Sequence, residues 1–230
     1  MQTMTGYRLE IPPVDLAKRG NLIVFDLDGT VVDSKTLHRL NYRRVFEQMG
    51  YGTLTDEEAD RLNGPNGEEI CRIMGVAPKL RAWYNTLYDE SVRELVLRCG
   101  RMFPGMVRVL QRLSQTATLA LLSNGSQAYC EANVQHFALN AWFARYTGYV
   151  DGMNKADNIR KWMLAYGQPR LMVVGDRAGD IRCAREAGAI AIGVTYGMGE
   201  REELKDADAL CDTPEEILSV CEAYGMGRSH

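Results

Sequence analysis

The sequence predicts an α/β fold in which a doubly wound, Rossmann-like parallel sheet forms the core and an all-helical cap domain is inserted into it. Three observations predict this fold. Short apolar runs of strand length recur along the chain, helix-like stretches separate the later runs, and residues 35–99 show helical periodicity without a convincing strand. Strands that alternate with helices are typical of parallel sheets covered by helices on both faces.

The first predicted strand is Asn21–Asp26, an apolar run that ends in an acid. Runs of the same kind predict strands at residues 118–123, 170–175 and 189–194, with a weaker candidate at 207–210. Helical patterns between these runs predict helices at residues 105–114, 127–137, 155–166 and 180–187. Together these elements predict the sheet and its covering helices.

The inserted segment begins after the first strand. Apolar residues recur near helical spacing from Leu37 to Met49 and again from Trp83 to Leu95, and the turn sequence Asn63–Gly67 separates the two stretches. Phe103-Pro104-Gly105 marks the return to the sheet. We therefore expect residues 1–34 and 101–230 to form the core domain and residues 35–100 to form a helical cap.

Composition excludes several classes of function. The 230 residues carry a formal net charge of −3, which provides no basic field for nucleic acid or an anionic membrane. No apolar run approaches the roughly 18 residues of a membrane span, and the first residues lack the apolar stretch of a secretion signal. The six cysteines show no CxxC spacing, so neither zinc nor disulfides are indicated. We expect a cytoplasmic protein without nucleic-acid or membrane partners; its oligomeric state stays open.

Chemically reactive side chains follow three of the predicted strands. Asp26-Leu27-Asp28-Gly29-Thr30 follows the first, Ser123-Asn124-Gly125 the second, and Asp176 to Asp180 another, while Lys155 begins the helix before that last strand. Carboxyl ends of parallel strands meet at one edge of a sheet, where ligands bind. A lone Asp after a strand is usually an N-cap, but Asp-x-Asp-Gly-Thr is rare at average composition. All four elements in this order predict a catalytic site.

These elements resemble motifs one to four of the haloacid-dehalogenase superfamily, and the helical insert resembles the small helical cap of that family. Val31–Ser34 and Phe103–Gly105 are similar to the branch that contains phosphoglycolate phosphatase and β-phosphoglucomutase. Two positions depart from the family pattern. No proline follows Lys155, and Arg177 stands where a small hydroxyl residue is frequent. Neither change removes a reactive group.

The resemblance implies a Mg²⁺-dependent phosphatase that transfers a phosphoryl group to Asp26 and then to water. Asp28 acts as general acid and then general base, and we expect the neighbouring carboxylates to keep a proton on it. Lys155 neutralises charge beside Asp26, and Ser123 holds a phosphate oxygen. Further substrate or phosphate contacts are expected from Gly29, Thr30, Asn124, Gly125, His38, Asn63 and Asn66. The metal ligands are expected to be Asp26, Asp28 (through its main-chain carbonyl), Asp176 and Asp180.

Two alternatives to a phosphatase stay open. A phosphosugar mutase returns the phosphoryl group to a sugar; His38 matches a position where such mutases carry histidine, but Gly67 stands where they carry a phosphate-binding arginine. Thr30 also fits the hydrolases better. A catalytically inactive binding module usually lacks one of the core carboxylates, and here all are present. Hydrolysis of a small phosphorylated metabolite fits best, although the sequence does not identify the metabolite.

Overall fold

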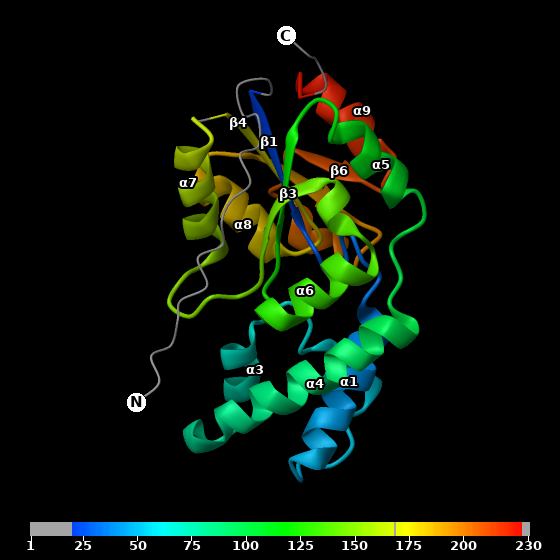
Figure 1. The fold of residues 1–230 in the computed structure, drawn as a ribbon, viewed down its shortest axis with the longest axis vertical. Coiled ribbons are helices and arrows are strands. Elements are labelled where there is room, and N and C mark those ends of the chain that lie inside the picture. Colours follow the sequence, from blue (N-terminus) through cyan, green and yellow to red (C-terminus); the bar gives the residue numbers. More distant parts are fainter. Residues whose placement is uncertain (1–19, 168, 227–230) are drawn as a thin grey trace.

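The computed structural model describes residues 20–167 and 169–226, so residues 1–19 of the predicted core domain lie outside the described residues. The centre is a six-stranded parallel sheet in the order β3-β2-β1-β4-β5-β6 (Figure 1). Its strands are β1 (Asn21–Asp26), β2 (Thr118–Leu122), β3 (Phe143–Thr147), β4 (Arg170–Gly175), β5 (Ile190–Val194) and β6 (Ala209–Cys211). This order is the doubly wound arrangement, and the predicted fold is confirmed.

Helices cover both faces of the sheet because its strands are apolar on both sides. In β1, Leu22 and Val24 pack in one buried cluster, while Ile23 and Phe25 pack in another on the opposite face. The first cluster includes side chains of the neighbouring helices α7 and α8, and the second includes those of α5, α6 and α9. These helices are α5 (Met106–Leu113), α6 (Gln127–His136), α7 (Lys155–Ala165), α8 (Ala178–Ala187) and α9 (Glu216–Ala223).

Two core elements, β3 and α9, were not predicted from the sequence. Strand β3 has the sequence Phe-Ala-Arg-Tyr-Thr and lies at the edge of the sheet, where only Phe143 is fully buried. An edge strand needs no continuous apolar run, so the pattern that identified the central strands does not find it. Helix α9 packs against α5 near the end of the described chain.

The inserted segment 35–100, which we call the cap, contains helices and no strand. The helices are α1 (Lys35–Gln48), α2 (Asp56–Asp60), α3 (Gly67–Ile73) and α4 (Arg81–Cys99). Figure 1 shows them grouped at one end of the molecule, beyond the carboxyl ends of the strands. Helix α1 lies along α4, where Phe46 packs on Tyr84 with ring centroids 5.6 Å apart. That the cap is a separate domain bounded at these residues stays a proposal.

The two connections between core and cap run side by side. The backbone N–H of Asp33 donates to the carbonyl of Arg101 (2.9 Å), and that of Phe103 donates to the carbonyl of Val31 (3.2 Å). The chain therefore leaves the sheet and returns to it through one hydrogen-bonded pair of segments. Such a narrow connection suits a hinge.

Within the two described ranges, no helix is long and apolar enough to cross a membrane. A cytoplasmic location stays a prediction from the sequence.

Candidate active site

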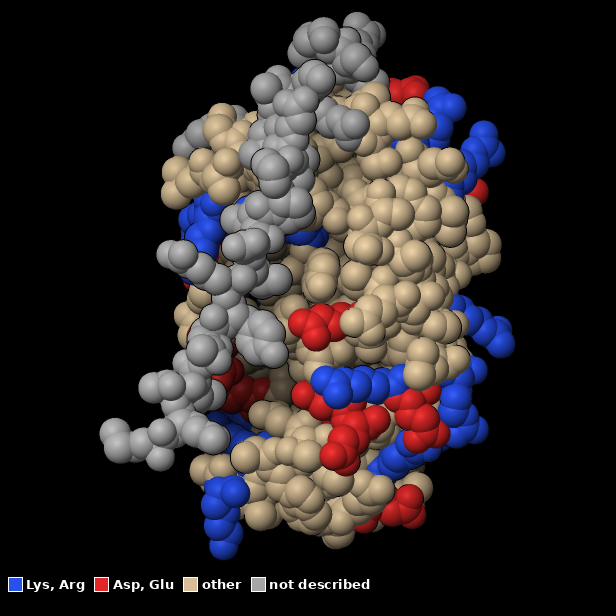
Figure 2. Space-filling model, viewed as in Figure 1, with Lys and Arg blue, Asp and Glu red and all other residues tan. Residues whose placement is uncertain are grey.

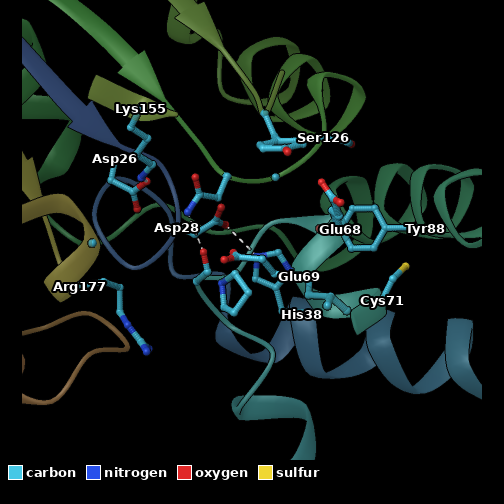
Figure 3. Close-up of a pocket in the computed structure, with 18 of the residues that line it drawn as sticks. Asp26, Asp28, His38, Glu68, Glu69, Cys71, Tyr88, Ser126, Lys155 and Arg177 are labelled. Carbon is cyan, nitrogen blue, oxygen red and sulfur yellow. Dashed lines mark hydrogen bonds and ion pairs between the residues drawn. The ribbon is translucent and has the colours of Figure 1, made fainter. Parts of the chain in front are cut away.

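The predicted reactive residues meet at the carboxyl ends of β1 and β4, which are neighbours in the sheet. Asp26 is the last residue of β1, and Asp176 follows β4 directly. Strands β2 and β3 extend the sheet on one side of β1, and β4, β5 and β6 extend it on the other side. The strand order therefore reverses between β1 and β4, which is where ligands bind in open parallel sheets. A cavity of about 780 Å³ lies here between the sheet and the cap (Figure 3).

Lys155 joins the end of β1 to the first turn of α8, the helix that follows β4. Its Nζ donates a hydrogen bond to Oδ1 of Asp26 and another to Oδ1 of Asp180, the latter at 2.7 Å. Burial opposes the charge on Lys155, but the two carboxylates outweigh burial and raise the pKa of the amine. Lys155 occupies this place because Asn154 and Asp157 form a reciprocal capping box that fixes the first turn of α7.

Three buried carboxylates, those of Asp26, Asp176 and Asp180, bring oxygen atoms within 4.8 Å of one another. Burial raises the pKa of Asp26 well above its usual range, against the influence of Lys155, and Asp180 and Asp176 raise it further. Burial and the charge of Asp180 raise the pKa of Asp176 to about 7. Beside Lys155 alone, Asp26 and Asp176 therefore hold their protons to a higher pH than usual, and a bound cation would shift both toward the carboxylate form.

The donor set fits a hard divalent cation such as Mg²⁺. Oδ2 of Asp176 accepts from the backbone N–H of Met198 (2.7 Å), whereas its buried Oδ1 has no hydrogen-bond partner among the described residues. Mg²⁺ prefers such carboxylate oxygens. The close approach of this side chain depends on Gly29, which has a φ of 75°, because a Cβ there would lie 2.1 Å from Oδ2 of Asp176.

Asp28 lies two residues beyond the end of β1, and its carboxylate accepts hydrogen bonds from three side chains. The Tyr129 phenol donates to its Oδ1, the N–H at Nε2 of His38 donates to the same oxygen (2.9 Å), and Ser123 Oγ donates to Oδ2 (3.2 Å). Figure 3 shows Asp28 between the Asp26–Lys155 pair and the cap. Burial opposes ionisation of Asp28, but the charge and hydrogen bond of His38 and the bond from Tyr129 hold its pKa below the usual value.

The expectation that crowded carboxylates keep a proton on Asp28 is therefore wrong for this structure. The crowding acts on Asp26 and Asp176 instead. The physical reason is orientation: the strand ends at Asp26, and the turn that follows directs the Asp28 side chain to His38 and Tyr129.

The loop after β2 contributes contacts within the protein. Ser123 Oγ accepts from the backbone N–H of Gly125 (2.9 Å) while it donates to Asp28. The Asn124 side chain donates to the carbonyl of Gly64 in the cap (2.7 Å), so it bridges core and cap. Both Asn124 and Gly125 line the cavity, whereas Thr30 is fully buried beneath it.

Of the cap residues expected to contact substrate, only His38 lines the cavity. The Asn66 side chain accepts from the backbone N–H of Glu69 (3.0 Å) and caps α3, and Asn63 is 3% exposed. Neither lies in the cavity wall, which on this side is formed by Gly64, Gly67 and their neighbours. The structure thus brings the turn to the site but not these two side chains.

Sequence reasoning missed two residues that complete the site. Tyr129 is in the first turn of α6, and Ser126 caps that helix and donates to Oδ1 of Asp89 in α4 (2.5 Å). One signal could have found Tyr129. A helix that begins at the carboxyl end of a strand places the inward-facing residue of its first turn near the ligand site.

Comparisons with known proteins agree with this arrangement. Residues 23–194 match the family model described as haloacid dehalogenase-like hydrolase. A phosphoglycolate phosphatase of Synechococcus elongatus is 30% identical over 205 residues, covering 86% of this chain and 95% of the relative. One of Vibrio parahaemolyticus is 26% identical over the same shares of both chains. The crystal structure of a predicted phosphatase from Clostridium acetobutylicum has a TM-score of 0.76 at 21% identity, covering 88% of this chain and 98% of that one.

Proposed function

The chain belongs to the haloacid dehalogenase-like hydrolase family, and from this premise we propose that it is a Mg²⁺-dependent phosphatase that hydrolyses a small phosphorylated metabolite through an aspartyl-phosphate on Asp26. Phosphoric monoester hydrolysis is the activity of its named relatives. The observation that carries the proposal is the contact between Lys155 and Asp26 at the edge of a cavity that three buried carboxylates share.

Asp26 has the position of a nucleophile. Lys155 donates to Oδ1, and the positive charges of Lys155 and of a bound cation would keep the carboxylate ionised. Oδ2 then attacks phosphorus, and the bond from phosphorus to the leaving oxygen breaks. The ammonium group of Lys155 lies where negative charge gathers on the phosphoryl oxygens. Water then attacks the aspartyl-phosphate and regenerates the carboxylate, which splits one difficult displacement into two easier ones.

Asp28 is proposed to transfer the protons. Its low pKa makes it a carboxylate in the free enzyme. A phosphate dianion that binds beside it raises that pKa through like-charge repulsion, so the carboxyl takes up a proton as the substrate arrives. It then donates this proton to the leaving alkoxide and, as a carboxylate again, accepts one from the attacking water. His38 and Tyr129 keep its oxygens in place during both steps.

The metal ligands in this proposal are Asp26, Asp176 and the main-chain carbonyl of Asp28. When bound, Mg²⁺ supplies positive charge that neutralises the phosphoryl oxygens. Asp180 belongs to the same cluster and would ligate the metal directly or orient a water bound to it. It also accepts from Lys155 and from the backbone N–H of Arg177 (3.1 Å), so it positions Lys155 as well. The free Oδ1 of Asp176 is the best-placed ligand atom of the set.

Turnover of p-nitrophenyl phosphate tests the proposal. Purified protein should release phosphate with Mg²⁺, lose activity in a chelator and recover it when Mg²⁺ is added back. Incubation with a sugar phosphate should give free phosphate and not an isomeric sugar phosphate, which separates a phosphatase from a mutase. Activity that survives complete chelation, or an isomerised sugar phosphate as the main product, would contradict the proposal.

A further inference from the structure

The cavity extends past the catalytic carboxylates toward the cap, and its far part is acidic. If the proposed function holds, the phosphoryl group binds at Asp26 and Lys155, so the rest of the cavity must contain the leaving group. Glu68 and Glu69 of α3, Asp89 of α4 and Asp151 of the loop after β3 line that part. Acidic side chains are visible at the junction of core and cap in Figure 2, and Figure 3 shows Glu68 and Glu69 across the cavity from Lys155.

Basic residues do not balance these acids. Among the described lining residues, Arg81 is the one arginine or lysine that the cap contributes, and its Nη1 lies 3.4 Å from Oε1 of Glu68. The other basic residues of the lining, Lys155, Arg177 and Arg182, belong to the core. Lys155 contacts two carboxylates, Arg177 pairs with Glu203 (3.2 Å), and Arg182 is on the core helix α8. A negative charge on the leaving group is therefore repelled on the cap side.

A second observation indicates a polar ligand in the same place. Tyr84 is 1% exposed and lines the cavity, yet its hydroxyl has no hydrogen-bond partner among the described residues. Nε of Arg81, three residues before it in the same helix, is also buried without a partner. A buried polar group without a partner is unfavourable. A hydroxyl of a bound ligand could accept from Nε of Arg81 or pair with the Tyr84 phenol, whereas an ammonium group could donate only to the Tyr84 oxygen. Burial raises the pKa of Tyr84, so the phenol keeps its proton and can donate as well as accept.

From these two observations we propose that the leaving group is a polar alcohol without negative charge, bearing hydroxyl or ammonium groups, and that the acidic cap side rejects a carboxylate or a second phosphate. This inference rests on the proposed function and narrows its substrate class. It also separates this chain from the relatives named phosphoglycolate phosphatase, because phosphoglycolate has a carboxylate on its leaving group.

A comparison of three phosphate esters of similar size tests the substrate class. The values of kcat/KM for glycerol 3-phosphate and for ethanolamine phosphate should each exceed that for 2-phosphoglycolate by about tenfold or more. The ratio between these kcat/KM values should become smaller as the salt concentration is raised, because salt screens charges in an open cavity. Equal or faster turnover of 2-phosphoglycolate would overturn the inference and assign Arg81 to its carboxylate. Turnover of p-nitrophenyl phosphate is measured alongside, because its absence would instead refute the proposed function.

Paired variants test whether the acids cause the selection. The double variant Glu69→Gln/Asp151→Asn removes two charges from the lining, and glutamine keeps the capping geometry of position 69. It should raise 2-phosphoglycolate turnover relative to glycerol 3-phosphate by several-fold. The control Glu57→Gln/Glu90→Gln makes the same charge change at exposed sites outside the lining. If both double variants move the ratio equally, the cavity acids do not select the leaving group and the inference is wrong.

Discussion

The phenol of Tyr129 donates a hydrogen bond to Oδ1 of Asp28, across 101 positions of sequence. The same oxygen accepts from His38 in the first cap helix. One carboxylate oxygen therefore joins the core helix α6, the loop after β1 and the cap. This arrangement fixes the orientation of Asp28 and lowers its pKa.

Tyr129→Phe tests that contact because it removes the donor and keeps the buried ring. The pKa of Asp28 should rise once a donor to its charged form is lost, and the limb of the pH profile of kcat/KM that reports Asp28 should move to higher pH. We expect kcat for alkyl phosphates to fall by about tenfold, with a smaller change in KM. Tyr146→Phe, on half-buried β3 outside the cavity lining, is the matched control. An unchanged pH profile would show that Tyr129 only fills space.

Asp28→Asn tests proton transfer through the leaving group. The variant should lose about 10² to 10⁴-fold in kcat for alkyl phosphates, whose alkoxides need a proton. The loss should be smaller for aryl phosphates, which leave readily as anions. A plot of activity against leaving-group pKa should therefore be steeper for the variant than for the unaltered protein. Parallel plots would count against a general-acid role.

We expect the carboxylate cluster to make stability depend on both pH and Mg²⁺. Because the pKa of Asp176 is raised to about 7, the folded state binds this proton more tightly than the unfolded chain does. That contribution to stability is fully present below the unfolded value near 3.8 and is lost as pH rises through about 7. Mg²⁺ competes with the proton, so it should raise Tm more at about pH 8 than at about pH 6. Asp176→Asn should abolish most of this difference; an equal Mg²⁺ shift at both pH values in the unaltered protein would refute the assignment.

Asn66 should affect stability more than substrate choice. Asn66→Ala removes the cap of α3 and should lower the free energy of unfolding by about 1 kcal/mol, whereas Asn66→Ser, which can still cap, should lower it much less. Urea denaturation of both variants measures the difference. A changed order of substrates in a variant of unchanged stability would restore the earlier expectation of a substrate contact at Asn66.

The sequence was sufficient to predict the central sheet and the residues at its edge. Asp26, Lys155 and Asp176 were predictable because each stands at a strand end or helix start, and parallel strands bring those positions together. The edge strand β3 was not predictable, because an edge position needs no continuous apolar run.

The ionisation of Asp28 could not be predicted, for a different reason. Spacing along the chain places Asp28 two residues from Asp26, but side-chain orientation is decided by the turn after the strand and by helices distant in sequence. Asn66 illustrates the same limit. Its position in the turn was informative, but its side chain accepts a hydrogen bond from the backbone of α3 and does not face the cavity.

The most direct test of the central claim is kcat for p-nitrophenyl phosphate with saturating Mg²⁺ in Asp26→Asn, beside Asp33→Asn as the matched control. Asp33 is exposed and lies outside the cavity lining, so its variant should keep most of the activity. Asp26→Asn should lose at least about 10³-fold, because an amide oxygen is a very poor nucleophile toward phosphorus, and it should remain folded. Activity in a folded Asp26→Asn protein close to that of Asp33→Asn would show that another group attacks the phosphoryl centre.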